Sequence, residues 1–182
     1  EEDLLIAEYE HAGHNTLGAF AYPGVTLQRT ERVAVRRLDA LLAEARLDRL
    51  DVLKLDVEGA EIRALEGAAQ VLKKTRPVVL FDVLEAALRA QGGSGGALLE
   101  WLRSRGYRLY AFGEDSGRPV PAEFGQLSDN MIAAPAERPL PPHLCAEPLR
   151  RSSPAAPRAG VPVRQGCGAT KLHGHREAHP AE

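Results

Sequence analysis

Residues 51–83 read DVLKLDVEGAEIRALEGAAQVLKKTRPVVLFDV, and their hydrophobic periodicity divides them into three segments. Residues 52–57 and 78–83 are almost entirely apolar, which is typical of strands buried on both faces of a parallel sheet. Between them, apolar residues recur every three or four positions and predict one helix over residues 60–74. The apolar stripe of this helix consists of Ile62, Leu65, Ala69 and Leu72. The segment therefore predicts a βαβ unit with a right-handed crossover and two parallel strands.

The flanking sequence continues the alternation of strands and helices. Further strands are expected at residues 4–7, 107–112 and 130–134. Short helices are expected at residues 38–42, where Asp39 caps or opens the helix, and at residues 98–102, where Gly106 ends the helix in a left-handed conformation. The glycine-rich residues 92–96 follow a helical segment rather than a strand, so they predict a joint or a helix start and not a phosphate loop. This alternation predicts an α/β fold.

Composition limits the classes of protein to which the chain can belong. The 182 residues are 44% hydrophobic and 26% charged, which is enough apolar surface for a core, and the formal net charge is -2. This charge provides no general attraction to nucleic acid or to an anionic membrane, and the apolar runs are far too short to cross a bilayer. The two cysteines, Cys145 and Cys167, do not form a disulfide framework. We therefore expect a cytoplasmic protein with no nucleic-acid or membrane partner.

The two ends of the sequence differ in character from its centre. Nine of the 13 prolines lie from Pro135 onward, and residues 136–182 show neither helical nor strand periodicity. Residues 1–135 carry a net charge of -5, and residues 136–182 carry +3. A domain is therefore expected over residues 1–135, followed by a disordered, Pro-rich tail. The chain begins Glu1-Glu2 without a methionine or a signal region, which favours a piece of a longer protein.

Acidic residues follow both strands of the expected βαβ unit. Asp56 and Glu58 lie at the carboxyl end of the first strand, and Asp82 lies at the same end of the second. Neighbouring strands are about 5 Å apart, and ligands of open parallel sheets bind beyond this edge. The carboxylates could orient a hydroxylated or cationic ligand, hold a metal or act as a general base. The alternative is that Glu58 and Glu61 are solvated charges that open a helix.

The same residues resemble a known family. The segment DVLKLDVEGAE, residues 51–61, looks like the signature of the FkbM-like methyltransferases, and the similarity continues through residues 64–68 and 76–81. Residues 35–42, 102–107 and 130–135 fit the neighbouring parts of that family. The motif is long and ordered, so it is more specific than a lone glycine-rich loop. The resemblance covers roughly residues 30–135.

This resemblance implies a Rossmann-like fold and an S-adenosylmethionine-dependent enzyme. Such enzymes commonly methylate a hydroxyl of a small-molecule or carbohydrate-type acceptor. By position, Asp56, Glu58 and Asp82 are the expected catalytic residues, which line the acceptor site and orient or deprotonate the hydroxyl. Asp82 stands where the family usually has Glu. Nothing before Val33 offers the Gly-x-Gly turn on which such enzymes bind the cofactor, so roughly the first three strands of the sheet are expected to be missing.

Three functions remain open on the sequence. The first is a methyltransferase whose cofactor half lies on other polypeptide, and the second is a non-catalytic remnant or interaction module with the same fold. The third is a metal-dependent site built on Asp56, Glu58 and Asp82. It is an alternative only, because the preferred interpretation assigns no metal ligand. His11 and His14 could lie near the acceptor, but the polarity of a loop also explains them.

Overall fold

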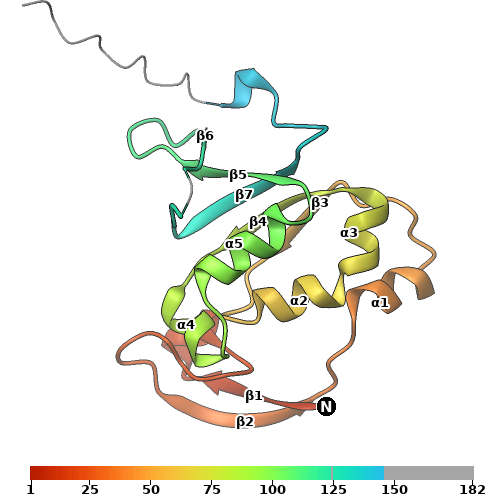
Figure 1. Ribbon diagram of the computed structural model, residues 1–182. Coiled ribbons are helices and arrows are strands. Elements are labelled where there is room, and N and C mark those ends of the chain that lie inside the picture. The colour runs from red at the N-terminus through yellow and green to blue at the C-terminus, as the bar shows by residue number, and fades with distance from the viewer. Residues whose placement is uncertain (124, 146–182) are drawn as a thin grey trace, which may run out of the picture. The chain divides into compact units, whose positions relative to one another are not determined.

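A mixed five-stranded sheet forms the centre of the computed structural model, which describes residues 1–123 and 125–145 (Figure 1). The strand order is β3-β4-β7-β5-β6. The bounds are Val52–Leu55 for β3, Val78–Asp82 for β4, Tyr107–Phe112 for β5, Pro119–Pro121 for β6 and Asn130–Pro135 for β7. β7 is antiparallel to both of its neighbours, β4 and β5. The described chain therefore has the expected α/β fold.

The predicted βαβ unit is present, since β3 and β4 pair in parallel with Leu55 opposite Phe81. The single helix expected over residues 60–74 is wrong, because the chain forms α2 (Glu61–Gly67) and α3 (Ala69–Thr75) with a break at Ala68. Gly67 is a weak helix former. The carboxylate of Asp39 also accepts hydrogen bonds from the backbone N–H groups of Gln70 and Val71, which begins a second helix. Asp39 thus caps α3 and not its own helix, α1 (Leu38–Glu44).

The expectation that both strands of this unit are buried on two faces is also wrong. β3 is the edge strand of the sheet. Val52 is 56% exposed, whereas Leu55 is buried. On β4, Val79 and Phe81 are fully buried while their neighbours are only partly covered. The apolar character of β3 therefore does not reflect two covered faces, and it leaves apolar surface at a free edge.

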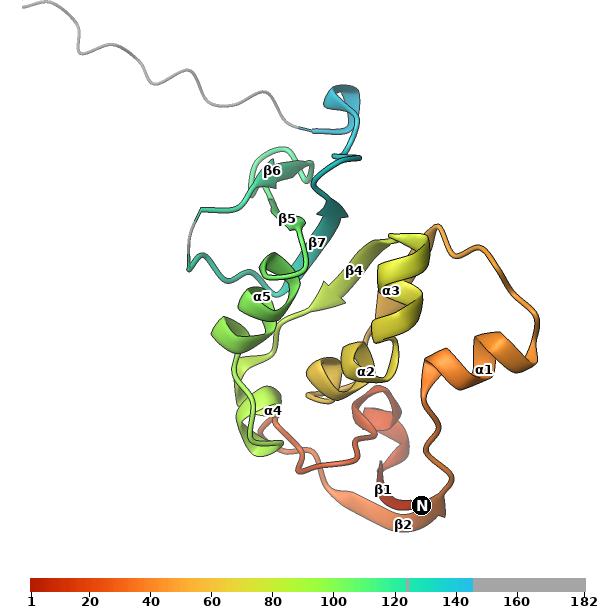
Figure 2. The same ribbon diagram turned by 45° about the vertical axis from the view of Figure 1, so that its right-hand side comes forward.

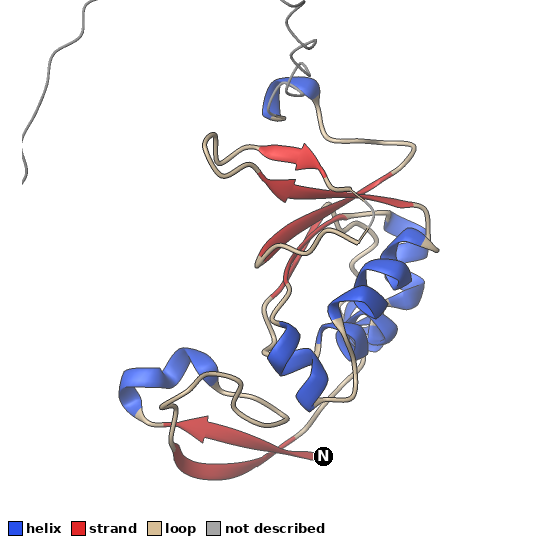
Figure 3. Cartoon of the chain, turned by 60° about the vertical axis from the view of Figure 1, so that its left-hand side comes forward, coloured by secondary structure: helices blue, strands red, loops and turns tan. Residues whose placement is uncertain are grey.

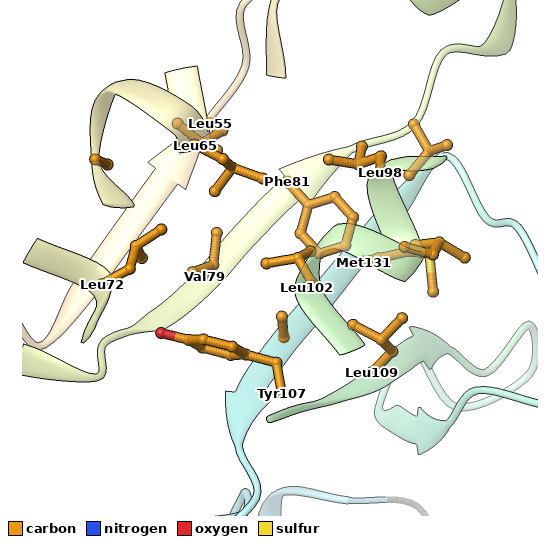
Figure 4. Packing of buried hydrophobic residues seen from close by; sticks show 14 of the residues in the cluster. Leu55, Leu65, Leu72, Val79, Phe81, Leu98, Leu102, Tyr107, Leu109 and Met131 are labelled. Atoms are coloured by element: carbon orange, nitrogen blue, oxygen red, sulfur yellow. The ribbon is translucent and has the colours of Figure 1, made fainter. Parts of the chain in front are cut away.

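One face of the main sheet is covered by helices. In Figure 3, the helices of the βαβ unit and α5 (Gly95–Arg103) gather on the same side of the strands. The core lies between these layers, and Figure 4 shows Phe81, Leu102 and Met131 packed together within it. Ser94 caps α5 by accepting from the N–H of Ala97, so the glycine-rich segment is a helix start, as expected. The packing of this face holds β3 and β4 in place.

The opposite face carries a smaller apolar cluster. Tyr110, Ile132 and Ala134 are buried there, and Leu140 and Cys145 pack against them. The packed body thus continues past Pro135 into the segment that contains the short helix η2 (Pro142–Leu144). The rest of the expected tail, residues 146–182, lies outside the described residues.

Arg76 ties the amino end of β4 to the far end of α5. It occupies a left-handed position after α3, with φ of 52°. Its guanidinium donates to the carbonyl oxygens of Arg105 and Gly106 at 2.8 and 3.0 Å, and to both carboxylate oxygens of Glu137. It also stacks on the ring of Tyr107, 4.5 Å from the ring centre. This cluster closes the end of the sheet opposite to the acidic residues.

A separate two-stranded antiparallel sheet precedes the main sheet. It consists of β1 (Glu2–Ala7) and β2 (Leu27–Val33), and Figure 2 shows it outside the main sheet. The loop between them contains the 3-10 helix η1 (Tyr9–His14). An ion pair between Glu2 and Arg63 connects β1 to α2. The expected strand at residues 4–7 is confirmed, but it does not join the main sheet.

Candidate functional site

The carboxyl ends of β3 and β4 bring Asp56 and Asp82 to one edge of the sheet. Asp56 directly follows β3, and Asp82 is the last residue of β4, so each comes directly after one of the paired residues Leu55 and Phe81. Both aspartates line a pocket of about 170 Å³, together with side chains of the neighbouring strands. Asp56 is exposed and paired with Lys54. We call this edge, together with Glu58 and Glu61, the acidic rim.

Asp82 is half-buried, and its surroundings disfavour the charged form. Burial raises the pKa of Asp82 from 3.8 to about 6, and the negative charge of Glu61 is the next largest cause. The charges of Asp56 and Glu58 act in the same direction. One carboxylate oxygen of Asp82 is enclosed and has no hydrogen-bond partner among the described residues. Asp82 therefore takes up a proton more readily than an ordinary aspartate does.

Glu61 is a rim residue that begins α2, as expected, but the alternative interpretation of Glu61 as a solvated charge is wrong. It is only 1% exposed, and burial raises its pKa. Its Oε1 accepts from the N–H groups of Val57 and Gly59, each at 3.3 Å, while its Oε2 is buried without a described partner. A signal was present, because Glu61 lies four residues before Leu65 and so shares the buried face of the helix.

Glu58 lies in a strained turn between β3 and α2. Its φ is 49°, a left-handed conformation that costs a residue with a side chain about 1–3 kcal/mol. The next residue, Gly59, has φ of 99°, and a Cβ there would lie 2.4 Å from the carbonyl oxygen of Ala87 in α4 (Glu85–Ala90). The turn thus requires glycine at one position and strain at the other. Such strain persists only where surrounding contacts hold it.

Two side chains from distant parts of the sequence hold this turn. Thr16 donates through Oγ1 to the carbonyl oxygen of Glu58 at 3.0 Å, and Gln91 donates through Nε2 to the same oxygen at 3.0 Å. Thr16 is 2% exposed and itself accepts from the N–H of Gly18. The loop after β1 and the end of α4 therefore both fix the position of Glu58.

The same loop places a histidine beside the rim. His14 Nδ1 lies 3.5 Å from Glu58 Oε1 without forming a hydrogen bond, and the His14 ring packs 4.2 Å from the ring of Tyr22. Burial raises the pKa of Tyr22, and the carboxylates of Glu58 and Asp82 act in the same direction. His14 and Tyr22 thus lie beside the acidic rim. The ring of His11 lies 6.1 Å from that of His14.

The described residues offer neither a metal centre nor an open glycine-rich turn. Within residues 1–123 and 125–145, no group of three or more histidine, cysteine or acidic side chains is arranged to hold a metal ion, which removes the support for a site on Asp56, Glu58 and Asp82. The glycine N–H groups at the starts of α2 and α5 are already used, since Gly59 donates to Glu61 and Gly95 donates to Glu85 at 2.7 Å. Neither amide is free to receive the carboxylate or ribose of a cofactor.

Helices of the described chain are also too short or too polar to span a membrane.

Comparison with known proteins gives one family and one partial relative. The family model described as "Methyltransferase FkbM domain" matches residues 5–109. The "AMB antimetabolite synthetase AmbE" of Pseudomonas aeruginosa is 38% identical over 79 residues, which are 43% of this chain and 4% of that protein. The chain therefore spans only a small part of this relative's length. No solved structure gives a significant match.

Proposed function

Because the chain belongs to the FkbM methyltransferase family, we propose that it forms the acceptor side of an S-adenosylmethionine-dependent methyltransferase. The proposed acceptor is a small-molecule or carbohydrate-type hydroxyl compound. The proposed fold is Rossmann-like, with β3 and β4 as inner strands of a larger sheet. In this proposal, Asp56, Glu58 and Asp82 carry the acceptor chemistry.

The arrangement of the acidic rim is the observation that carries the proposal. Asp56 and Asp82 line one pocket at the carboxyl ends of adjacent parallel strands, where ligands of open α/β sheets bind. Carboxylate oxygens accept hydrogen bonds from sugar-like hydroxyl groups and orient them. The pKa of Asp82 is raised to about 6, so its carboxyl group can accept or return a proton close to neutrality.

The described residues do not fit S-adenosylmethionine. The two glycine-containing helix starts have their amides occupied by Glu61 and Glu85. β3 has a free edge with Val52 exposed. We propose that further strands of the domain pair with this edge and carry the donor pocket.

Calorimetry tests the placement of the donor pocket. Titration of this chain with S-adenosylmethionine is expected to give no measurable heat. Measurable binding by the chain alone would overturn the assignment of the donor pocket to other polypeptide.

Methyl transfer tests the acceptor role of the rim. The reading frame extended upstream of Glu1 would be assayed with methyl-labelled S-adenosylmethionine and a panel of monosaccharides. Asp56→Asn is expected to lower turnover, whereas Asp48→Asn, which alters an exposed ion pair with Lys74, is expected to leave it unchanged. A folded Asp56→Asn protein with full turnover would remove the proposed role of the rim.

The free edge of β3 also favours a second candidate function. A short edge strand with an exposed apolar residue, such as Val52, can pair with a strand of another chain. The chain would then be a non-catalytic interaction module with a methyltransferase-like fold. Partner-dependent folding without methyl transfer in the assay above would favour this candidate.

A further inference from the structure

Hydrogen bonds connect the loop between β1 and β2 both to β1 and to Glu58 of the acidic rim. Thr16 forms a bridge to Leu5 of β1 through two backbone hydrogen bonds of 2.9 and 3.1 Å. Asn15 accepts from the N–H of Ala7 at 2.9 Å. Thr16 then donates to Glu58. The residue just before this anchored pair is His14, so its backbone is held at a fixed distance from Glu58.

The His14 ring is positioned by two contacts of different kinds. Glu58 Oε1 lies 3.5 Å from Nδ1, and the Nδ1 atom is enclosed and forms no hydrogen bond among the described residues. Glu58 is itself well covered, with 14% of its side chain exposed. Tyr22 packs on the ring at 4.2 Å with a tilt of 42°. A carboxylate at one ring nitrogen favours the tautomer with its proton on that nitrogen and leaves the other nitrogen as an acceptor.

We propose that His14 is the general base of the acidic rim, with Nε2 accepting the proton of the acceptor's hydroxyl group. Glu58 is its positioning residue, because the carboxylate 3.5 Å from Nδ1 favours the proton on that nitrogen. This inference rests on the proposed function and assigns the proton transfer within it. In the step, the O–H bond of the acceptor breaks, its electron pair stays on oxygen, and an N–H bond forms at Nε2. The resulting imidazolium is paired with the Glu58 carboxylate and later loses its proton to water.

The separate roles of His14 as base and Glu58 as positioning residue have a physical basis. Imidazole is the side chain most often used as a general base near neutral pH. A carboxylate that pairs with the imidazole orients it and stabilises the charge that forms. The left-handed turn at Glu58 places its carboxylate near the loop histidine, which gives the strain a functional explanation.

Nitrogen NMR of the ring tests the proposal without any cofactor or acceptor. The chain is labelled with ¹⁵N-histidine, His14→Gln assigns the signal, and spectra are recorded at about pH 8.5, where histidine rings are ordinarily neutral. The expected result for the natural chain is a protonated Nδ1 and an unprotonated Nε2. A protonated Nε2 would overturn the proposal, because that atom could not accept a proton.

Two variants test the part played by Glu58. Glu58→Asn keeps a residue that tolerates the left-handed turn but shortens the side chain beyond reach of the ring. It is expected to move the tautomer toward protonated Nε2, and Asp56→Asn is expected to leave the tautomer unchanged. An unaltered tautomer in Glu58→Asn would refute the positioning role.

The turnover assay separates this inference from the proposed function. If methyl transfer occurs and His14→Gln has full turnover, the base role fails and the methyltransferase stands. If the tautomer is as expected and no variant or natural protein transfers methyl groups, the proposed function fails while the oriented imidazole stands.

Discussion

Replacing Gly59 with alanine tests how closely the rim turn is packed. Gly59 has φ of 99°, and an added Cβ would lie 2.4 Å from the carbonyl oxygen of Ala87 and 2.6 Å from its carbon. A left-handed backbone costs alanine about 1–2 kcal/mol. The overlap is with backbone of α4, which cannot rotate aside, and forced repacking of this kind adds about 1–3 kcal/mol. We expect Gly59→Ala to lower the free energy of unfolding by about 2–5 kcal/mol.

A matched control separates the two contributions. Gly24 also has positive φ, 84°, but nothing lies within 4 Å of its Cβ position. Gly24→Ala is therefore expected to lose only the backbone part, about 1–2 kcal/mol. Equilibrium unfolding in urea, followed by circular dichroism, measures both. Equal losses in the two variants would show that α4 does not press on the turn and would refute the reasoning.

Other changes test the core, the sheet end and the rim charge. Leu65→Ala removes a fully buried side chain and is expected to cost about 2–5 kcal/mol in urea unfolding, so a loss below 1 kcal/mol would contradict the core assignment. Arg76→Gln removes the donor to the carbonyl oxygen of Arg105 and the charged partner of Glu137, and is expected to cost about 1–3 kcal/mol, which an unchanged melting temperature would exclude. The pKa of Asp82 is raised to about 6 on folding, so its ionisation destabilises the folded state as the pH rises from about 4 to 6. Asp82→Asn is therefore expected to be more stable than the natural chain by about 1–2 kcal/mol above pH 6, after allowance for partial exposure, with the gain vanishing below about pH 4. A gain that is independent of pH would contradict this cause.

The βαβ unit was predictable because its signals are local. Hydrophobic runs mark β3 and β4, and a helical period marks the segment between them. Asp56 comes directly after the first hydrophobic run and Asp82 lies near the end of the second, so the pattern placed both at one edge of the sheet. Local pattern could not show that β3 is an edge strand, since burial depends on what covers a strand and not on its own composition.

The errors arise from contacts between distant residues. The helix break at Ala68 depends on Asp39, which caps α3 from about 30 positions earlier in the chain, as its hydrogen bond to Val71 shows. The nearness of His14 to Glu58 depends on the bridge between Thr16 and β1, which no periodicity marks. Glu61 is different, because its place on the stripe of Leu65 was visible in the spacing and its charge led to the wrong interpretation.

Carboxyl NMR of Asp82 tests the central claim, that parallel strands gather interacting carboxylates at one rim. The side-chain ¹³C signal of Asp82 would be followed from pH 3 to pH 8 in the natural chain and in Glu61→Gln. If the carboxylates interact at one rim, Asp82 titrates with a midpoint near pH 6 in the natural chain and with a lower midpoint when the charge of Glu61 is removed. A midpoint near the ordinary value of 3.8 that Glu61→Gln leaves unchanged would contradict it.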